Sequence, residues 1–138
     1  MPITALGPED LEAAVALWER AGLTRAWNPS DDDFRRALHG CSSTILGLLE
    51  DGRLVGTAMV GHDGHRGWVY YLAVDPPSQR SGAGRQLMQA AERWLRDAGV
   101  AKVQLMVRRD NYAAATFYER LEYERADVEV FARWLDDA

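Results

Sequence analysis

The feature that most constrains the fold is an apolar run that breaks at a glycine-containing turn and continues as a long helix. The run Trp68–Val74 is apolar throughout, as in a strand buried in the middle of a sheet. Asp75–Pro77 interrupts it, and the turn Gln79–Arg85 leads into a helical pattern with one apolar side. A strand that feeds a helix in this way is typical of α/β proteins whose helices pack on a sheet.

The turn has the chemistry of an anion site. Successive backbone N–H groups in such a turn can point inward, and a helix N-terminus adds free donors and a partial positive charge. Gly82 and Gly84 let phosphate oxygens approach the backbone, while Arg80 and Arg85 can add charge-assisted contacts. The ending of a P-loop is missing, and the third glycine of a dinucleotide fingerprint is replaced by Leu87. On this motif alone, a purely structural turn is an equal alternative.

The rest of the chain alternates between strand and helix patterns. Strands are expected at Ile3–Leu6, Thr44–Leu49, Leu54–Val60, Lys102–Val107 and in the tail Tyr123–Leu135, and helices from 7–10 to about Arg20, from a Ser30 cap to Gly40, and over Asn111–Arg120. This order predicts a mixed α/β sheet with helices on its faces. The 138 residues fit a single domain spanning 1–138.

Composition excludes several classes of partner. The net charge of −5 argues against a nucleic-acid surface, and one cysteine, Cys41, allows neither an internal disulfide nor a thiolate zinc cluster. We therefore expect no metal. No apolar run approaches the roughly 20 residues of a membrane span, and the N-terminus lacks the pattern of a signal peptide. These observations predict a cytoplasmic protein that does not bind a membrane.

A second block, Asn111–Tyr123, follows the glycine turn after one helix and one strand. Its pattern is Asn-x-x-Ala-x-x-Phe-Tyr-Glu-x-Leu-x-Tyr, and the turn reads Gln-x-x-Gly-x-Gly after Val74. The two blocks at this separation resemble the GNAT family of N-acetyltransferases, in the form of a small bacterial single-domain member. The resemblance covers nearly the whole chain. It departs at Glu122, where the family usually has glycine, which puts the local turn geometry in question.

The resemblance implies a central mixed, mostly antiparallel sheet flanked by about four helices. It also implies an acetyltransferase that uses acetyl-CoA, whose acceptor amine attacks the thioester directly in a ternary complex. The residues that it implies for cofactor binding are Leu72, Ala73, Val74, Gln79, Arg80, Ser81, Gly82, Ala83, Gly84, Arg85, Asn111 and Tyr118. Tyr118 is the expected acid for the leaving thiolate, and Asn111 caps its helix as an alternative to binding the cofactor.

The acceptor side is less defined. Arg25, Trp27 and Asn28, in the loop between the first two helices, and Tyr70 are the candidates for substrate binding. No general base is assigned; the candidates are Glu50, Asp63, His65, Tyr70 and Tyr71. The leading prediction is an N-acetyltransferase of small amines. A protein N-terminal or lysine acetyltransferase and a non-catalytic acyl-CoA sensor remain alternatives, and a homodimer is compatible with the sequence.

Overall fold

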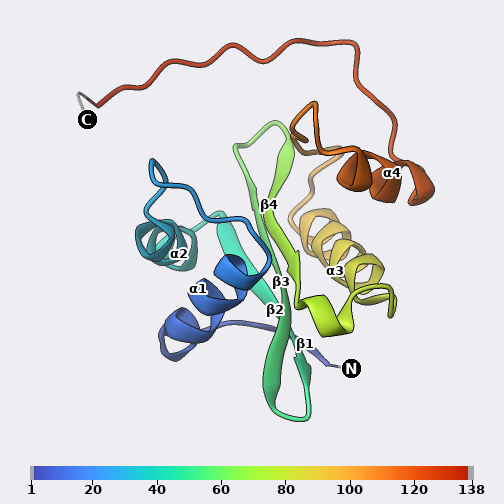
Figure 1. Cartoon of the computed structure of the whole chain (residues 1–138). Helices are drawn as coiled ribbons and strands as arrows, with labels where there is room; N and C mark the ends of the chain where they lie inside the picture. Colours follow the sequence, from blue (N-terminus) through green and yellow to red (C-terminus); the bar gives the residue numbers. More distant parts are fainter. Residues whose placement is uncertain (1, 137–138) are drawn as a thin grey trace. The chain divides into compact units, whose positions relative to one another are not determined.

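The computed structural model describes residues 2–136, and the chain forms two compact units divided between Met106 and Val107. The first unit is built on a five-stranded sheet in the order β1-β2-β3-β4-β5, in which β5 alone runs parallel to its neighbour (Figure 1). The strands are β1 Ile3–Ala5, β2 Ser43–Glu50, β3 Arg53–His62, β4 Gly67–Val74 and β5 Val103–Gln104. A mixed, mostly antiparallel sheet was expected, and this prediction is confirmed.

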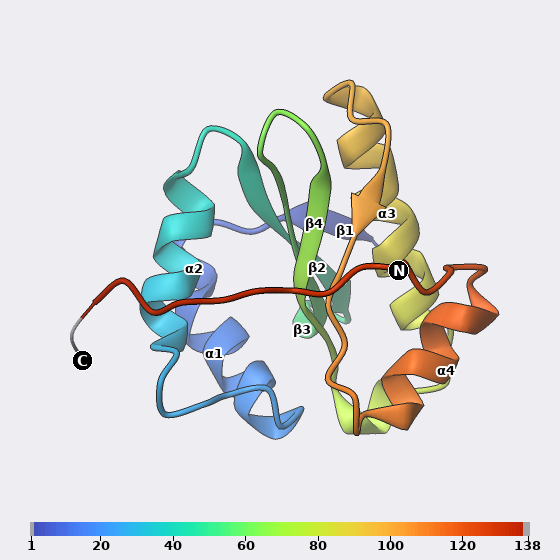
Figure 2. The ribbon, with the colours of Figure 1, turned by 90° about the horizontal axis from the view of Figure 1, so that it is seen from above.

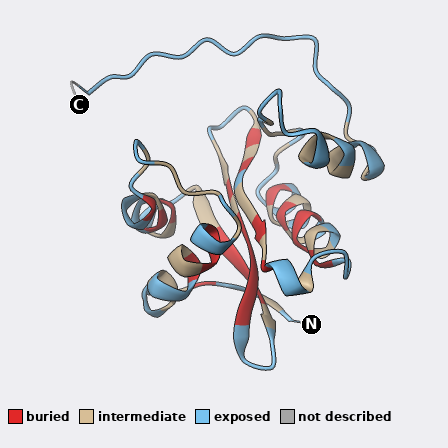
Figure 3. Ribbon diagram, viewed as in Figure 1, coloured by how far each residue is buried: buried red, intermediate tan, exposed pale blue. Residues whose placement is uncertain are grey.

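Three α-helices of the first unit cover the two faces of this sheet. They are α1 Leu11–Arg20, which follows the 3-10 turn η1 Pro8–Asp10, α2 Ser30–His39, and α3 Ala83–Asp97, which follows the 3-10 turn η2 Pro76–Ser78. Figures 1 and 2 show α1 and α2 on one face of the sheet and α3 on the other. Figure 3 shows that the buried residues lie on the strands and on the helix sides that face them.

Each face of the sheet has its own apolar core. On the side of α1 and α2, Trp18 and Phe34 are fully buried. On the other side, a Cβ atom on Gly56 would lie 2.8 Å from Leu87 Cδ1, and one on Gly67 would lie 2.6 Å from a Leu95 methyl. The two strand glycines therefore let α3 pack directly on the backbone of β3 and β4.

Two of the expected elements differ from the structure near their ends. Ser30 was expected to cap α2, but it is the first helical residue, Pro29 takes the cap position, and no side chain caps the helix. The strand expected over Lys102–Val107 is limited to β5, because only two of its residues find a ladder partner on β4.

The second unit contains one helix, α4 Tyr112–Arg120. The strands expected within Tyr123–Leu135 are absent from the described tail, which has no ladder partner there. Alternation of apolar and polar residues meets only one requirement of a strand, since the backbone also needs a neighbouring strand to bond with. The prediction of tail strands is therefore wrong for the described residues.

Candidate functional site

The centre of β4 carries a β-bulge. Between two successive ladder pairs, β3 contributes the single residue Ala58, while β4 contributes both Tyr71 and Leu72. Tyr71 has a φ of 49°, a left-handed conformation that a bulky residue rarely adopts. The strand predicted to hold the cofactor is thus irregular at the start of Leu72–Val74.

A hydrogen-bonded network holds the bulge on the side of α1 and α2. The Thr57 hydroxyl donates to the Tyr71 carbonyl at 2.9 Å, and Trp18 Nε1 donates to Thr57 Oγ1 at 2.8 Å. The Trp18 indole stacks on the Tyr71 ring with centroids 3.9 Å apart, and the Tyr71 hydroxyl donates to Asp33 Oδ2 at 2.7 Å. Partial burial and the Asp33 carboxylate raise the pKa of Tyr71 to about 12. This network was not predicted from the sequence. The sequence shows only a threonine within an apolar strand.

The bulge places two consecutive tyrosines on one face of the sheet. Tyr70 pairs with Met59, and directly paired residues share a face. Met59 and Tyr71 both pack against the core formed with α1 and α2, so Tyr70 points to that side as well. Tyr70 is exposed on this face, with 46% of the residue's surface accessible to solvent. The expectation of a strand buried on both faces is therefore wrong at Tyr70.

The edge of β4 that faces away from β3 is largely unpaired. Within the described part of the first unit, β5 pairs with β4 only at Gly67 and Trp68. Backbone groups on this edge of the predicted segment Leu72–Val74 therefore lack a ladder partner from β5. An extended ligand can bind to such an edge as an added strand does. The Val74 carbonyl is an exception, because the Gln79 side chain donates to it at 3.1 Å.

The glycine turn follows directly and has two left-handed residues, Arg80 with a φ of 66° and Gly82 with a φ of 87°. Gly82 occupies the cap position of α3, and within the described residues no side chain caps the start of this helix. The free N–H donors come from Ala83, Gly84 and Arg85. Alternation of left-handed and other conformations turns neighbouring N–H groups toward a common point, as in an anion nest.

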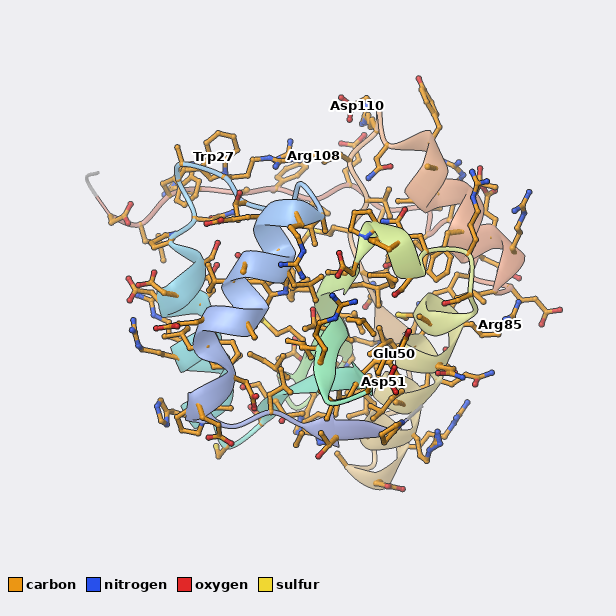
Figure 4. The ribbon with its side chains drawn as sticks, turned by 60° about the horizontal axis from the view of Figure 1, so that its bottom comes forward. Trp27, Glu50, Asp51, Arg85, Arg108 and Asp110 are labelled. Carbon is orange, nitrogen blue, oxygen red and sulfur yellow. The ribbon has the colours of Figure 1, made fainter. Side chains whose placement is uncertain are left out.

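The side chains of the turn are divided between fixing the loop and facing solvent. The Ser81 hydroxyl donates to the Ser78 carbonyl, and Gln79 ties the turn back to the end of β4. Arg80 and Arg85 are exposed, and Figure 4 shows Arg85 at the start of α3. The turn thus combines fixed backbone donors with two free cationic side chains, which suits a phosphate ligand.

An ion pair that the sequence analysis missed anchors the segment between the bulge and the turn. Arg20 of α1 donates to both carboxylate oxygens of Asp75, at 3.2 and 3.3 Å. The Asp75 side chain is 7% exposed, while that of Arg20 is 46% exposed. Asp75 follows the last residue of β4, so the pair connects α1 to the start of the chain segment that forms the turn.

The predicted acceptor residues divide into two kinds. One guanidinium nitrogen of Arg25 donates to the carbonyls of Gly22 and Thr24, at 3.0 and 2.8 Å, and Arg25 forms an isolated bridge with Asn28. These two residues build the loop between α1 and α2. Trp27 lies on the same loop with 53% of its surface exposed (Figure 4). Of Arg25, Trp27 and Asn28, Trp27 is exposed and the other two are half-buried.

Three of the candidate bases lie at the ends of the hairpins, away from the bulge. Glu50 is next to the turn between β2 and β3 (Figure 4), and Asp63 and His65 belong to the turn between β3 and β4. Five residues of β3 separate Ala58 from the first turn and four separate it from the second, which is roughly 13–17 Å of extended chain. Asp63 accepts backbone hydrogen bonds from Arg66 and His65, which lower its pKa to about 2. Asp63 is therefore a turn residue and a poor base.

In the second unit, Asn111 caps α4, since its side-chain oxygen accepts from the Ala114 N–H at 3.1 Å. Tyr118 lies in an aromatic cluster, with ring centroids 5.0 Å from Phe117 and 5.8 Å from Tyr123. Burial raises the pKa of Tyr118 to about 12, so its phenol is neutral at neutral pH. The capping alternative for Asn111 is confirmed, and its binding of the cofactor remains a prediction.

Glu122 takes the left-handed position in which the family usually has glycine. Its φ is 69°, the Glu122 N–H bonds to the Glu119 carbonyl, and the Tyr123 N–H bonds to the Tyr118 carbonyl. These two bonds form a Schellman motif. The turn after α4 therefore keeps the geometry that glycine would give, although a glutamate forms it.

Among residues 2–136, no group of three or more His, Cys, Asp or Glu side chains could hold a metal ion. A helix with the length and apolar character needed to span a bilayer is also not found in that range.

Comparison with known proteins gives a consistent result. The model of the acetyltransferase (GNAT) family matches residues 9–123. An acetyltransferase of Pectobacterium atrosepticum is 41% identical over 127 residues, which are 92% of this chain and 90% of that protein. The ribosomal-protein-S18-alanine N-acetyltransferase from Escherichia coli is 31% identical, with a TM-score of 0.78 and coverage of 91% of this chain and 78% of the other. The aminoglycoside N-acetyltransferase AAC(6')-Iy, in complex with CoA, shares the fold at 17% identity with a TM-score of 0.84, over 98% and 95% of the two chains.

Proposed function

The chain belongs to the acetyltransferase (GNAT) family, and from this premise we propose that it transfers an acetyl group to the primary amine of a small molecule. It is an acyl-CoA-dependent acetyltransferase, and acetyl-CoA is its donor. In the proposed reaction the amine attacks the thioester carbonyl directly. The new C–N bond forms, the C–S bond breaks, the amine loses a proton, and the thiolate gains one.

The observation that carries this proposal is the open edge of β4 next to the glycine turn. The edge of β4 at Leu72–Val74 that has no β5 partner is suited to the amide-containing pantetheine arm, and the free N–H groups of Ala83–Arg85 are suited to the pyrophosphate. The two are joined by only a few residues, and the Gln79 amide and the Arg20–Asp75 pair fix the connection. We propose that Gln79, Arg80, Ser81, Gly82 and Arg85 complete the phosphate site.

Tyr118 is proposed to donate a hydrogen bond to the leaving thiolate. A thiol has a pKa of about 8.5. With the pKa of Tyr118 raised to about 12, full proton transfer from its phenol to the thiolate is uphill. The proposal is therefore that Tyr118 stabilises the departing sulfur by donating a hydrogen bond, and that the thiolate takes its proton from solvent. No general base is proposed, because the acceptor amine can lose its proton to water.

The acceptor is proposed to be a small cationic amine that binds on the side of α1 and α2. Trp27 and Tyr70 offer exposed aromatic rings, whose faces attract cations. The charged candidate for binding a substrate carboxylate, Arg25, is engaged by loop carbonyls, and the net charge of the chain is −5. Both observations favour a cationic acceptor over an amino acid.

A second candidate function is acetylation of a protein N-terminus. It is favoured by the 31% identity to an enzyme that acetylates the alanine of ribosomal protein S18, over 91% of this chain. A peptide acceptor would use backbone contacts as well as charge, so peptides belong in the assay beside small amines.

The experiment that tests the proposal follows free thiol release from acetyl-CoA with a panel of monoamines, diamines, amino acids and N-terminal peptides. We expect release with a cationic small amine, and about a 10- to 100-fold slower release by Tyr118→Phe, because a hydrogen bond to a charged group is worth about 1.5–3 kcal/mol. Release with peptides alone would support the second function. Tight acetyl-CoA binding without release for any acceptor would favour the sensor alternative.

Three broader predictions accompany this function. We propose that residues 1–138 act as one GNAT domain, which the family match across both compact units supports. A cytoplasmic location and a homodimer remain predictions. Light scattering of the purified chain tests whether it forms a homodimer.

A further inference from the structure

Thr57 is a polar residue in the fully buried part of β3, and both hydrogen-bonding functions of its hydroxyl are in use. Its oxygen accepts from Trp18 Nε1 at 2.8 Å, and its hydrogen is donated to the Tyr71 carbonyl at 2.9 Å. Valine has nearly the same shape and would need no partner in this apolar layer. The hydroxyl therefore meets a requirement other than packing.

The requirement lies in the peptide unit between Tyr71 and Leu72. A peptide bond is planar and trans, so its C=O and N–H point in opposite directions. Because the Thr57 hydroxyl holds the carbonyl of this unit from β3, the Leu72 N–H points away from Thr57. It is directed toward the edge of β4 that β5 leaves unpaired beyond Trp68.

This peptide unit is not one that the chain would orient without help. Tyr71 has a left-handed φ of 49°, and a residue in that region persists only when its surroundings determine it. The Trp18 ring, stacked at 3.9 Å, and the Asp33 carboxylate, at 2.7 Å from the phenol, fix the side chain. Thr57 is the member of the network that bonds to the strained backbone itself.

We infer that Thr57 is a positioning residue that, through the Tyr71 carbonyl, aims the Leu72 N–H at the thioester carbonyl oxygen of acetyl-CoA. Trp18 supports it, because the indole N–H occupies the Thr57 oxygen and leaves the hydroxyl hydrogen for Tyr71. The inference rests on the proposed function, in which Leu72–Val74 bind the acyl arm of the cofactor. A preorganised N–H at this point would stabilise the negative charge that develops on the oxygen.

The test compares Thr57→Val with Thr57→Ser, which keeps the hydroxyl, and with Thr44→Val, a matched change on β2. Infrared difference spectra of acetyl-CoA with a ¹³C-labelled carbonyl report how strongly the bound thioester is polarised. We expect the carbonyl band to shift to lower frequency on binding to the native enzyme, Thr57→Ser and Thr44→Val, and to lose most of that shift in Thr57→Val. Turnover of Thr57→Val should fall about 10- to 100-fold, with the acetyl-CoA Kd changed by less than about twofold.

The outcomes separate this inference from the proposed function. A native enzyme without any band shift would contradict the role of β4 and the inference with it. A native shift that Thr57→Val retains in full would overturn the inference alone and leave the proposed function standing. If Thr57→Val does not fold, Trp18→Phe keeps the aromatic ring but removes the indole donor. It should then lose part of the band shift, and full retention of the shift would overturn the inference.

Discussion

Tyr71 and Gly82 both adopt left-handed backbone conformations, one in the β4 bulge and one in the glycine turn, but different causes hold them there. At Gly82 a Cβ atom would meet no other atom within 4 Å, so the conformation depends on glycine itself. At Tyr71 the conformation depends on Thr57, Trp18 and Asp33, which come from three other elements. The backbone conformation at Gly82 is therefore determined by the residue itself, and the one at Tyr71 by tertiary contacts.

The difference explains which region a sequence can reveal. A glycine pattern before a helix is visible in the sequence, because the residue type is the cause of the conformation. A tyrosine in a strand gives no sign of its backbone angle, since its bonding partners lie far away in the chain. Variants at the two regions should therefore fail in different ways, and the following four predictions test this.

The largest effect is expected for Gly82→Ala. A left-handed alanine costs about 1–2 kcal/mol, and the turn relieves this strain by leaving the conformation that presents its N–H groups. Calorimetry should show acetyl-CoA binding about 5- to 30-fold weaker. Gly52→Ala is the matched control, because Gly52 has a φ of 76° and open space around it at the turn between β2 and β3. Equal loss of binding in both variants would contradict a specific role for the glycine turn.

A smaller effect is expected for Arg20→Ala, which leaves the buried Asp75 carboxylate without its cation. Removing one partner of a buried pair is destabilising, but water can reach this half-exposed site, so we expect a loss of about 1 kcal/mol. Arg35→Ala removes a fully exposed pair with Asp31 and should cost less than about 0.5 kcal/mol. Denaturant unfolding measures both losses, and equal values would show that the link between the bulge and the turn is not anchored by this ion pair.

Glu122→Gly tests a third left-handed residue, in the turn after α4. Glu122 has a φ of 69°, and the Schellman motif around it involves backbone bonds alone. Glycine should relieve the strain and raise the free energy of unfolding by about 0.5–1 kcal/mol. A destabilised variant would mean that the Glu122 side chain holds the turn, as Thr57 and Trp18 hold Tyr71.

The last prediction concerns stability at alkaline pH. The pKa values of Tyr71 and Tyr118 are raised from 10 to about 12 in the folded chain. Between pH 10 and 12 the unfolded chain therefore binds fewer protons than the folded one, and stability falls as pH rises. Below pH 10 these tyrosines should add no pH dependence. Urea unfolding should show a shallower decline in Tyr71→Phe, and an unchanged decline would mean that Tyr71 titrates normally.

Much of the fold followed from local patterns. The strand patterns at 44–49 and 54–60 correspond to β2 and β3, and the helical pattern with one apolar side after the glycine turn marked α3. The tail strands failed, because the pattern of Val128 and Val130 says nothing about whether a partner strand exists. A strand depends on a second segment in a way that a helix does not.

The site was predicted where backbone chemistry is tied to residue type and missed where it is not. The turn from Gln79 to Arg85 and the cap at Asn111 follow from local sequence. The Thr57 hydroxyl and the Arg20–Asp75 pair join residues far apart in the chain, so no local window contains them. Long-range polar contacts of this kind require the three-dimensional structure.

Backbone groups of the β4 bulge and of the glycine turn are proposed to hold acetyl-CoA, and amide hydrogen exchange tests this proposal. Exchange would be followed in peptides covering 72–74 and 79–85, with and without saturating acetyl-CoA, and in the peptide around Gly52 as a reference. We expect slower exchange in the first two peptides and no change in the third. If acetyl-CoA left the exchange rates of both 72–74 and 79–85 unchanged, these backbone groups would not be the binding site.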